Sequence, residues 1–343
     1  MAHRHQGVLD FSDPAVVFGD AASRQHAEAL FASLLARLEV DGDEPFVGVN
    51  MAAGMATIDI DDARSRLTDF AEFLNNNFFG PLKATAAKTP QPTPSSLSVP
   101  DLSRDQILPG SRSRIANLRR DCLIRDRHRC VISRHFDENE VFLRTNKHGD
   151  DAADDDGLRF VDTPDADEYD FLQVAHILPH SLMSIEGDDE RSVARSNALA
   201  ILEMLDAGVV HLIEGPNIDR PTNAITLTTR YHISFGTFRT FFEAVEGQPH
   251  TYRIQSVLTG RGRRPLQPVT RILFTSETID PPHPRLLAIH AAICRILHLS
   301  GAGGYWDDIL REAEGEMAKA DGSTSLGVLT ALRLGGWWDG VVV

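Results

Sequence analysis

The stretch Gln173–His180, Q-V-A-H-I-L-P-H, contains a short apolar run that ends at a histidine. A run that stops just before a proline is typical of a β-strand, because proline lacks the amide hydrogen that further pairing needs. About fifty residues downstream, a second short run, Asn223–Thr229, also predicts a strand. Phenylalanines at helical spacing in residues 231–245 predict a helix after it. The sequence therefore predicts two strands and a helix, with His176, Asn223 and His232 at one end of this unit.

Three motifs occur in a fixed order along this unit. They are Ala175-His176-Ile177-x-Pro179, Pro221-x-Asn223-Ala224 and His232-x-x-Phe235-Gly236. Together they resemble the His-Asn-His motif of the HNH endonucleases, which have the ββα-metal fold, and in particular the HNH-like nuclease domain variant of fungi. The stretch from Arg125 to Ile132 resembles the strand that enters those domains, and Tyr252–Ile254 resembles the strand after their helix. The resemblance covers roughly residues 110–343.

This resemblance and the local patterns predict an α+β fold. We expect a ββα-metal (HNH) core with a long insertion, a helical N-terminal segment and a helical C-terminal extension. Apolar residues at three- and four-residue spacing predict helices over 21–40 and about 61–83. The Pro- and Ser-rich stretch 89–101 has the composition of a linker. The predicted division is a helical N-terminal segment, a linker, an HNH nuclease-like domain and a helical C-terminal extension, at residues 1–88, 89–109, 110–275 and 276–343.

Other segments have simpler patterns. We expect residues 146–157, which are polar and acidic, to form a disordered loop or a surface insertion. Further helices are predicted over 110–127, 191–206, 283–299, 304–319 and 325–333. Further strands are predicted at 130–132, 141–143, 252–257 and 269–274.

Composition bounds the class of protein. The chain has 343 residues, 42% of them apolar, and no apolar run approaches the length of about eighteen residues that a membrane helix needs. Its N-terminus lacks the apolar core of a signal peptide. The three cysteines, Cys122, Cys130 and Cys294, are an odd and sparse set, which is typical of reduced thiols. We therefore expect an intracellular protein, cytoplasmic or nuclear, without a membrane partner.

The net charge of −15 does not favour DNA binding, because affinity for DNA comes largely from Lys and Arg that neutralise phosphates. The charge is uneven, however. Eight arginines lie between Arg112 and Arg134, and they could contact DNA. The alternative is that these arginines pair with nearby acids. A partner of a different kind is a second copy of the chain, bound through the N-terminal helices.

The resemblance implies a chemistry for the three motif residues. Phosphodiester hydrolysis needs a deprotonated water, a polarised phosphate and a stabilised leaving group. By resemblance, His176 is the general base, Asn223 orients the loop or the His176 ring, and His232 binds a divalent metal, Mg²⁺, Mn²⁺ or Zn²⁺. Histidine suits the first role because its ordinary pKa is close to neutral pH.

The metal site departs from the usual pattern. Ala175 and Gly236 stand where HNH sites usually have further ligands, and neither has a side chain that can bind a metal. One imidazole is a poor site for a divalent ion, so we expect His180 or an acid from the 150–170 segment to complete it.

Three functions follow from this pattern. The first is a metal-dependent endonuclease that cleaves DNA. The second keeps the scaffold and uses the pocket around His176, Asn223 and His232 for acid–base chemistry on a small molecule, such as a cyclisation or isomerisation in a fungal biosynthetic pathway. The third is a non-catalytic binding module. Fold alone does not separate them.

Overall fold

The computed structural model describes residues 68–86, 112–162, 168–183, 189–257, 269–313 and 325–337. These residues belong to two compact units. The predicted helix 21–40 and the predicted linker lie outside the described residues, so the predicted domain boundaries stay predictions. Unit 1 takes its residues from Met1–Ala84, Gly187–Met204 and Arg295–Val343, and unit 2 from Thr85–Glu186 and Leu205–Cys294.

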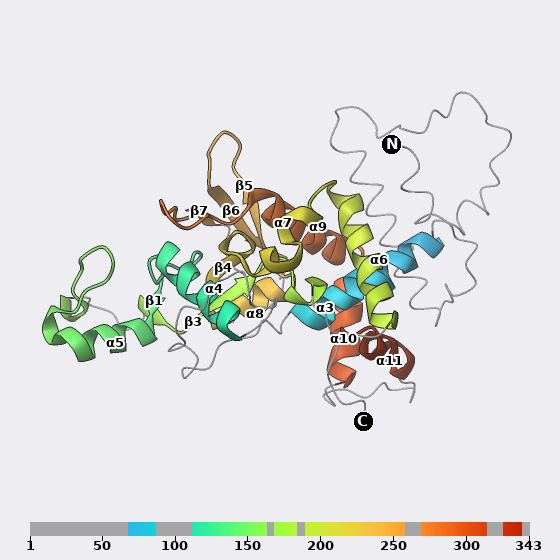
Figure 1. The fold of residues 1–343 in the computed structure, drawn as a ribbon, viewed down its shortest axis with the longest axis horizontal. Helices are drawn as coiled ribbons and strands as arrows, with labels where there is room; N and C mark the ends of the chain where they lie inside the picture. The colour runs from blue at the N-terminus through green and yellow to red at the C-terminus, as the bar shows by residue number, and fades with distance from the viewer. Residues whose placement is uncertain are drawn as a thin grey trace. The chain divides into compact units, whose positions relative to one another are not determined.

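The described chain mixes helices with small sheets, as expected for an α+β protein (Figure 1). The strands are β1 (Phe136–Asp137), β2 (Tyr169–Asp170), β3 (Leu172–His176), β4 (Ala224–Thr228), β5 (Thr240–Ala244), β6 (Thr251–Ser256) and β7 (Val269–Ile272). The main helices are α3 (Gly80–Ala86), α4 (Arg112–Arg125), α5 (Glu138–His148), α6 (Asp189–Leu205), α7 (Val210–Ile213), α8 (Thr229–Gly236), α9 (Pro284–Leu299), α10 (Ala302–Ala313) and α11 (Leu326–Leu334). The helices and strands predicted at α4, α6, α9, α11, β6 and β7 are thereby confirmed, and α10 agrees where it is described.

In unit 2, the predicted motif strands form an antiparallel pair. Leu172 of β3 lies opposite Thr228 of β4, and His176 lies opposite Ala224. All five residues of β4 are buried. Successive residues of a strand point to opposite faces, so both faces of β4 are covered. Helices α4 and α8 both pack against this pair.

A buried ion pair ties the end of α4 to β4. The Arg125 guanidinium donates from Nε and Nη2 to the two carboxylate oxygens of Asp126, each over 2.8 Å. It also donates to the carbonyl oxygens of Pro221, at 2.7 Å, and Ala224, at 2.9 Å. Asp126 in turn accepts from the amide of Thr226. Arg125 therefore holds the backbone on either side of Asn223.

The predicted motif helix over 231–245 is wrong in its second half. Helix α8 ends at Gly236, and residues 240–244 form β5, which pairs antiparallel with β6. Phe238 has a φ of +58°, which a right-handed helix cannot continue through. Phe241 and Phe242 are therefore buried from a strand, although their spacing also fits a helix.

Both strands predicted near residue 130 are also wrong. Residues 131–133 form a turn, in which the Val131 amide donates to the Thr226 carbonyl oxygen. Val141–Leu143 lies inside α5. Asp137 caps that helix by accepting from the Asn139 amide, and Glu138 and Glu140 in its first turn interact favourably with the positive N-terminal end of the helix dipole. These terminal signals outweigh the strand preference of three apolar residues.

The acidic segment 146–157 has regular structure, so the disordered loop predicted for it is wrong, while its mostly exposed residues agree with the alternative of a surface insertion. Its beginning completes α5, and Ala153 bridges to Arg159. Asp154 organises the turn by accepting from the amides of Asp156 and Leu158 and from the Arg129 guanidinium. A central carboxylate with three donors offsets the low apolar content of the segment.

Unit 1 is helical where it is described. Trp306 of α10 is buried and donates from Nε1 to the Asn75 side-chain oxygen at 2.9 Å. Lys83 of α3 pairs with Asp307 of α10 at 2.5 Å. Gly80 allows the close approach of Trp306, because a Cβ at this position would lie 2.1 Å from the indole ring.

The length and apolar content of the described helices determine whether any of them can cross a membrane. None of them alone is both long and apolar enough to cross a membrane, although the bent pair α9 and α10 passes the test of length and composition together.

Candidate active site

The pairing of β3 with β4 brings the three motif residues together. His176 is the last residue of β3, and Asn223 immediately precedes β4. The Ile177 amide donates to the Asn223 carbonyl oxygen at 2.8 Å, which continues the ladder one step beyond the strands. His232 lies in α8, which follows β4 directly. Burial lowers the pKa of His232, and the nearby His176 lowers it further. All three residues are buried.

Asn223 clamps the backbone after His176. Its side-chain oxygen accepts from the Leu178 amide, and its Nδ2 donates to the carbonyl oxygens of Leu178 and Ile218, all at 3.0 Å. These bonds use both amide hydrogens and the carbonyl. Asn223 therefore fixes the turn that follows His176 and also the segment that carries Asp219. Two roles were predicted for Asn223, orienting the loop or orienting the His176 ring. The hydrogen bonds of its side chain go to the loop backbone.

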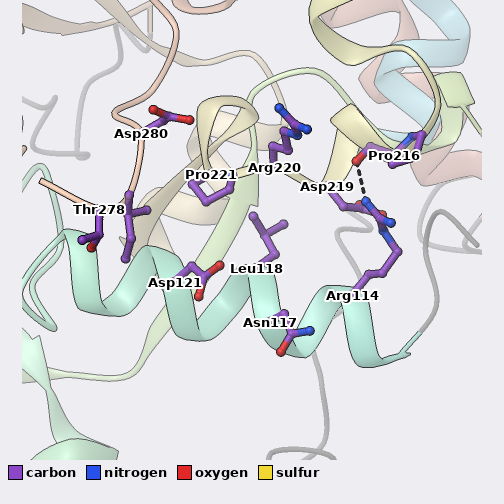
Figure 2. A pocket seen from close by; sticks show the side chains of 11 residues that line it. Arg114, Asn117, Leu118, Asp121, Pro216, Asp219, Arg220, Pro221, Thr278 and Asp280 are labelled. Atoms are coloured by element: carbon purple, nitrogen blue, oxygen red, sulfur yellow. Dashed lines mark hydrogen bonds and ion pairs between the residues drawn. The ribbon is translucent and has the colours of Figure 1, made fainter. Parts of the chain in front are cut away.

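His176 pairs with a carboxylate that we did not predict. Its Nε2 lies 3.1 Å from Oδ1 of Asp219, and the two side chains are 2% and 0% exposed. The other Asp219 oxygen lies 3.6 Å from Nε of Arg114 on α4. Arg114 also donates to the Pro216 carbonyl oxygen at 2.6 Å, which holds it against the turn that carries Asp219 (Figure 2). An adjacent guanidinium favours the ionised form of a buried carboxyl.

Two further imidazoles lie near this pair. His180 lies with its ring centroid 6.0 Å from that of His176. Burial lowers the pKa of His180, and His176 lowers it further, while Asp219 opposes both effects. Burial lowers the pKa of His232 to about 4, with a second contribution from His176. Both rings are therefore neutral at pH 7.

The resemblance implies a divalent metal, for which these imidazoles are the candidate ligands. Nδ1 of His176 and Nε2 of His180 and of His232 are buried and have no hydrogen-bond partner within the described residues. Neutral imidazole nitrogens of this kind can bind a metal. Nevertheless, no three His, Cys, Asp or Glu side chains in the described ranges come together closely enough to hold one. The described residues thus do not form a ready-made metal site, and His232 and His180 stay predicted ligands.

Most of the arginines between Arg112 and Arg134 interact within unit 2. Besides Arg125, the partners are Asp219 for Arg114, Asp137 for Arg119, Asp156 for Arg127, Asp154 for Arg129, and the Ile272 carbonyl and Phe274 ring for Arg134. Pairing with acids inside the unit reduces the positive potential that these side chains offer to phosphates. The DNA contact through this stretch stays a prediction.

A cavity of about 390 Å³ opens beside Asp219. Helix α4 forms one wall, and the opposite wall consists of the 216–221 turn and residues 278–280 (Figure 2). Sequence reasoning missed both Asp219 and this cavity. The available signal was an acid four residues before Asn223, within a turn bounded by Pro216 and Pro221, but nothing local connects that acid to His176.

Comparison with known proteins agrees with the motif. A family model described as HNH endonuclease matches residues 130–243, a segment that contains β3, β4 and α8 with His176, Asp219, Asn223 and His232. No curated protein and no solved structure matched the chain significantly. Residues 130–243 of this chain are therefore similar to the HNH endonuclease family, which confirms the resemblance inferred from the three motifs.

Proposed function

We propose that β3, β4 and α8 form a ββα core of the HNH type, and that the chain hydrolyses phosphodiester bonds in DNA with His176 as the general base. One observation carries this proposal. The His176 ring is held at Nε2 by Asp219, while its Nδ1 has no hydrogen-bond partner in the described part of the chain.

The pair determines which nitrogen can act as the base. An ionised carboxylate only accepts hydrogen bonds, so the Asp219 oxygen requires the proton of a neutral His176 ring to lie on Nε2. Nδ1 then has a lone pair that can take a proton from an attacking water. The imidazolium formed in that step is stabilised by the carboxylate at Nε2. A positioned general base accelerates such reactions about 10²- to 10⁴-fold.

The remaining motif residues support this step. Asn223 holds the turns that carry His176 and Asp219, so it acts as a positioning residue. HNH nucleases generally use a divalent metal, and His232 and His180 are its predicted ligands here. Because the described residues form no three-ligand group, we derive no step through a metal. The test below measures metal dependence directly.

The test is nicking of supercoiled plasmid by the purified full chain with Mg²⁺, Mn²⁺, Ni²⁺ or Zn²⁺, and with EDTA as a control. The variants are His176→Ala and Asp219→Asn. The matched control is His211→Ala, because His211 lies in the same unit with a side chain that is 82% exposed. Circular dichroism checks that each variant is folded.

We expect nicking by the wild-type chain and by His211→Ala, and a loss of at least about 100-fold in His176→Ala and in Asp219→Asn. If folded wild-type protein fails to nick DNA with each of the four metals, the nuclease proposal is rejected. It is also rejected if nicking persists in His176→Ala. Full activity of Asp219→Asn would reject only the role of the Asp219 carboxylate and leave the nuclease proposal standing.

A second candidate is acid–base chemistry on a small molecule. Two observations favour it: the arginines of the predicted DNA contact pair with acids of the same unit, and His176 and His232 are both buried. A buried base suits a substrate that enters a cavity better than it suits duplex DNA. The same nicking assay separates the two functions, because only the nuclease cleaves plasmid.

A further inference from the structure

The cavity beside Asp219 is lined by positively and negatively charged side chains. Arg114 and Arg220 contribute guanidinium groups, and Asp121, Asp219 and Asp280 contribute carboxylates. Figure 2 shows Asp121 and Asn117 on α4, with Arg220 and Asp280 on the opposite side. Its volume of about 390 Å³ falls in the range of small-ligand sites, roughly 300–1,000 Å³.

Arg220 is the cationic group best placed to bind a ligand. Its side chain makes no ion pair with any residue that the structure describes, and the residue is exposed at the rim of the cavity. A guanidinium presents paired N–H donors that match the oxygens of a phosphate. Arg114, by contrast, is already engaged by Asp219 and the Pro216 carbonyl oxygen.

The carboxylates limit which anion can bind. Arg114 and the fully buried carboxylate of Asp219 pair with each other, and the other charged lining groups are Arg220, Asp121 and Asp280. Two carboxylates against one guanidinium disfavour a ligand that is only an anion, such as inorganic phosphate. A nucleotide adds N–H groups on its base, and carboxylates accept hydrogen bonds from exocyclic amino groups such as N4 of cytosine. Asp280 is exposed at the cavity, so it can meet such a donor.

We propose that this cavity binds a single nucleotide of the DNA strand next to the bond that is cut, with its phosphate on Arg220 and the amino group of its base on Asp280. This inference rests on the proposed nuclease function. Its position is consistent with that role, because Asp219 borders the cavity and also holds the His176 ring. The site therefore favours a base with an amino group, such as cytosine, over thymine.

The test is isothermal titration calorimetry of the full chain with dCMP, dTMP and inorganic phosphate as probes. We expect saturable binding of dCMP that is tighter than binding of dTMP or phosphate. Arg220→Gln should weaken dCMP binding about fivefold, the size of one exposed charge contact. Asp280→Asn should reduce the preference for dCMP over dTMP. The matched control is Arg253→Gln, at an exposed arginine of β6 outside the cavity lining, which should bind dCMP like the wild-type chain.

The inference is overturned if folded wild-type protein does not bind dCMP, or if Arg220→Gln and Asp280→Asn bind it unchanged. Calorimetry tests the nucleotide site and the nicking assay tests the nuclease, so either proposal can be rejected without the other. Plasmid nicking without dCMP binding would reject this site and leave the nuclease proposal standing. Binding of dCMP without nicking would reject the nuclease and show a nucleotide site with another purpose.

Discussion

The Arg125→Met substitution removes the guanidinium that joins α4 to the backbone on both sides of Asn223. Arg125 is fully buried, and so is Asp126, to which it donates two hydrogen bonds of 2.8 Å. Removing one partner of a buried ion pair costs about 3–5 kcal/mol, because the other charge is left buried without compensation. The carbonyl oxygens of Pro221 and Ala224 also lose a donor. Since domains unfold at a cost of about 5–15 kcal/mol, we expect unit 2 to lose a large share of its stability.

The position of the tryptophans allows the two units to be followed separately. All three tryptophans lie within residues 295–343, which belong to unit 1. Hydrogen exchange at the Val131, Ile177 and Thr226 amides reports on unit 2, because each donates to a partner within it. In Arg125→Met, exchange at these amides should accelerate at least about 100-fold, as a loss of about 3 kcal/mol requires. The urea transition followed by tryptophan fluorescence measures the stability of unit 1.

The control for this prediction is the neighbouring Arg127→Met. Arg127 also pairs with an aspartate, Asp156, but both side chains are about half exposed, so its loss should cost no more than about 1 kcal/mol. The double variant Arg125→Met/Asp126→Leu should be less destabilised than the sum of the two single changes, because it leaves no unpaired charge. If Arg125→Met accelerates exchange no more than Arg127→Met does, the reasoning about the buried pair is refuted.

Three more predictions concern other parts of the chain. Burial lowers the pKa of His290 from 6.5 to about 3. Below pH 6.5 the unfolded chain therefore binds a proton at His290 that the folded chain does not bind. The free energy of unfolding of the protein should fall by about 1.4 kcal/mol per pH unit as the pH drops from 6 to 4. Urea titrations followed by circular dichroism should show a shallower slope for His290→Met, and an equal slope would contradict this assignment. Gly80→Ala should destabilise unit 1 by about 1–3 kcal/mol, since the new methyl group overlaps Trp306, and an unchanged urea midpoint of tryptophan fluorescence would speak against the contact. Burial raises the pKa of Cys122 to about 12, so a thiol reagent at pH 8 should leave Cys122 unmodified in the native chain and label it in urea; rapid native labelling, located by mass spectrometry, would show that the site opens.

Local sequence patterns were sufficient for many of the described elements. The apolar run that ends at His176 and the run after Asn223 are strands, and they pair in the register that brings the two residues together. The periodic segments at α4, α6 and α9 are helices within a few residues of the prediction. Such patterns are readable because they reflect which face of an element is buried. Where two periods fit the same residues, as at Phe241 and Phe242, the sequence could not distinguish a helix from a strand.

The tertiary structure alone decided how the motif residues are supported. Asp219 meets His176 across a separation of 43 residues, and Arg125 meets Ala224 across 99. Pairing of this kind depends on the register of β3 with β4 and on the packing of α4, neither of which leaves a periodic trace in the sequence. The sequence by itself determined the His-Asn-His motif and the elements that carry it, because both depend on neighbouring residues. The carboxylate at His176 and the cavity beside it arise from contacts between distant segments, so only the folded chain reveals them.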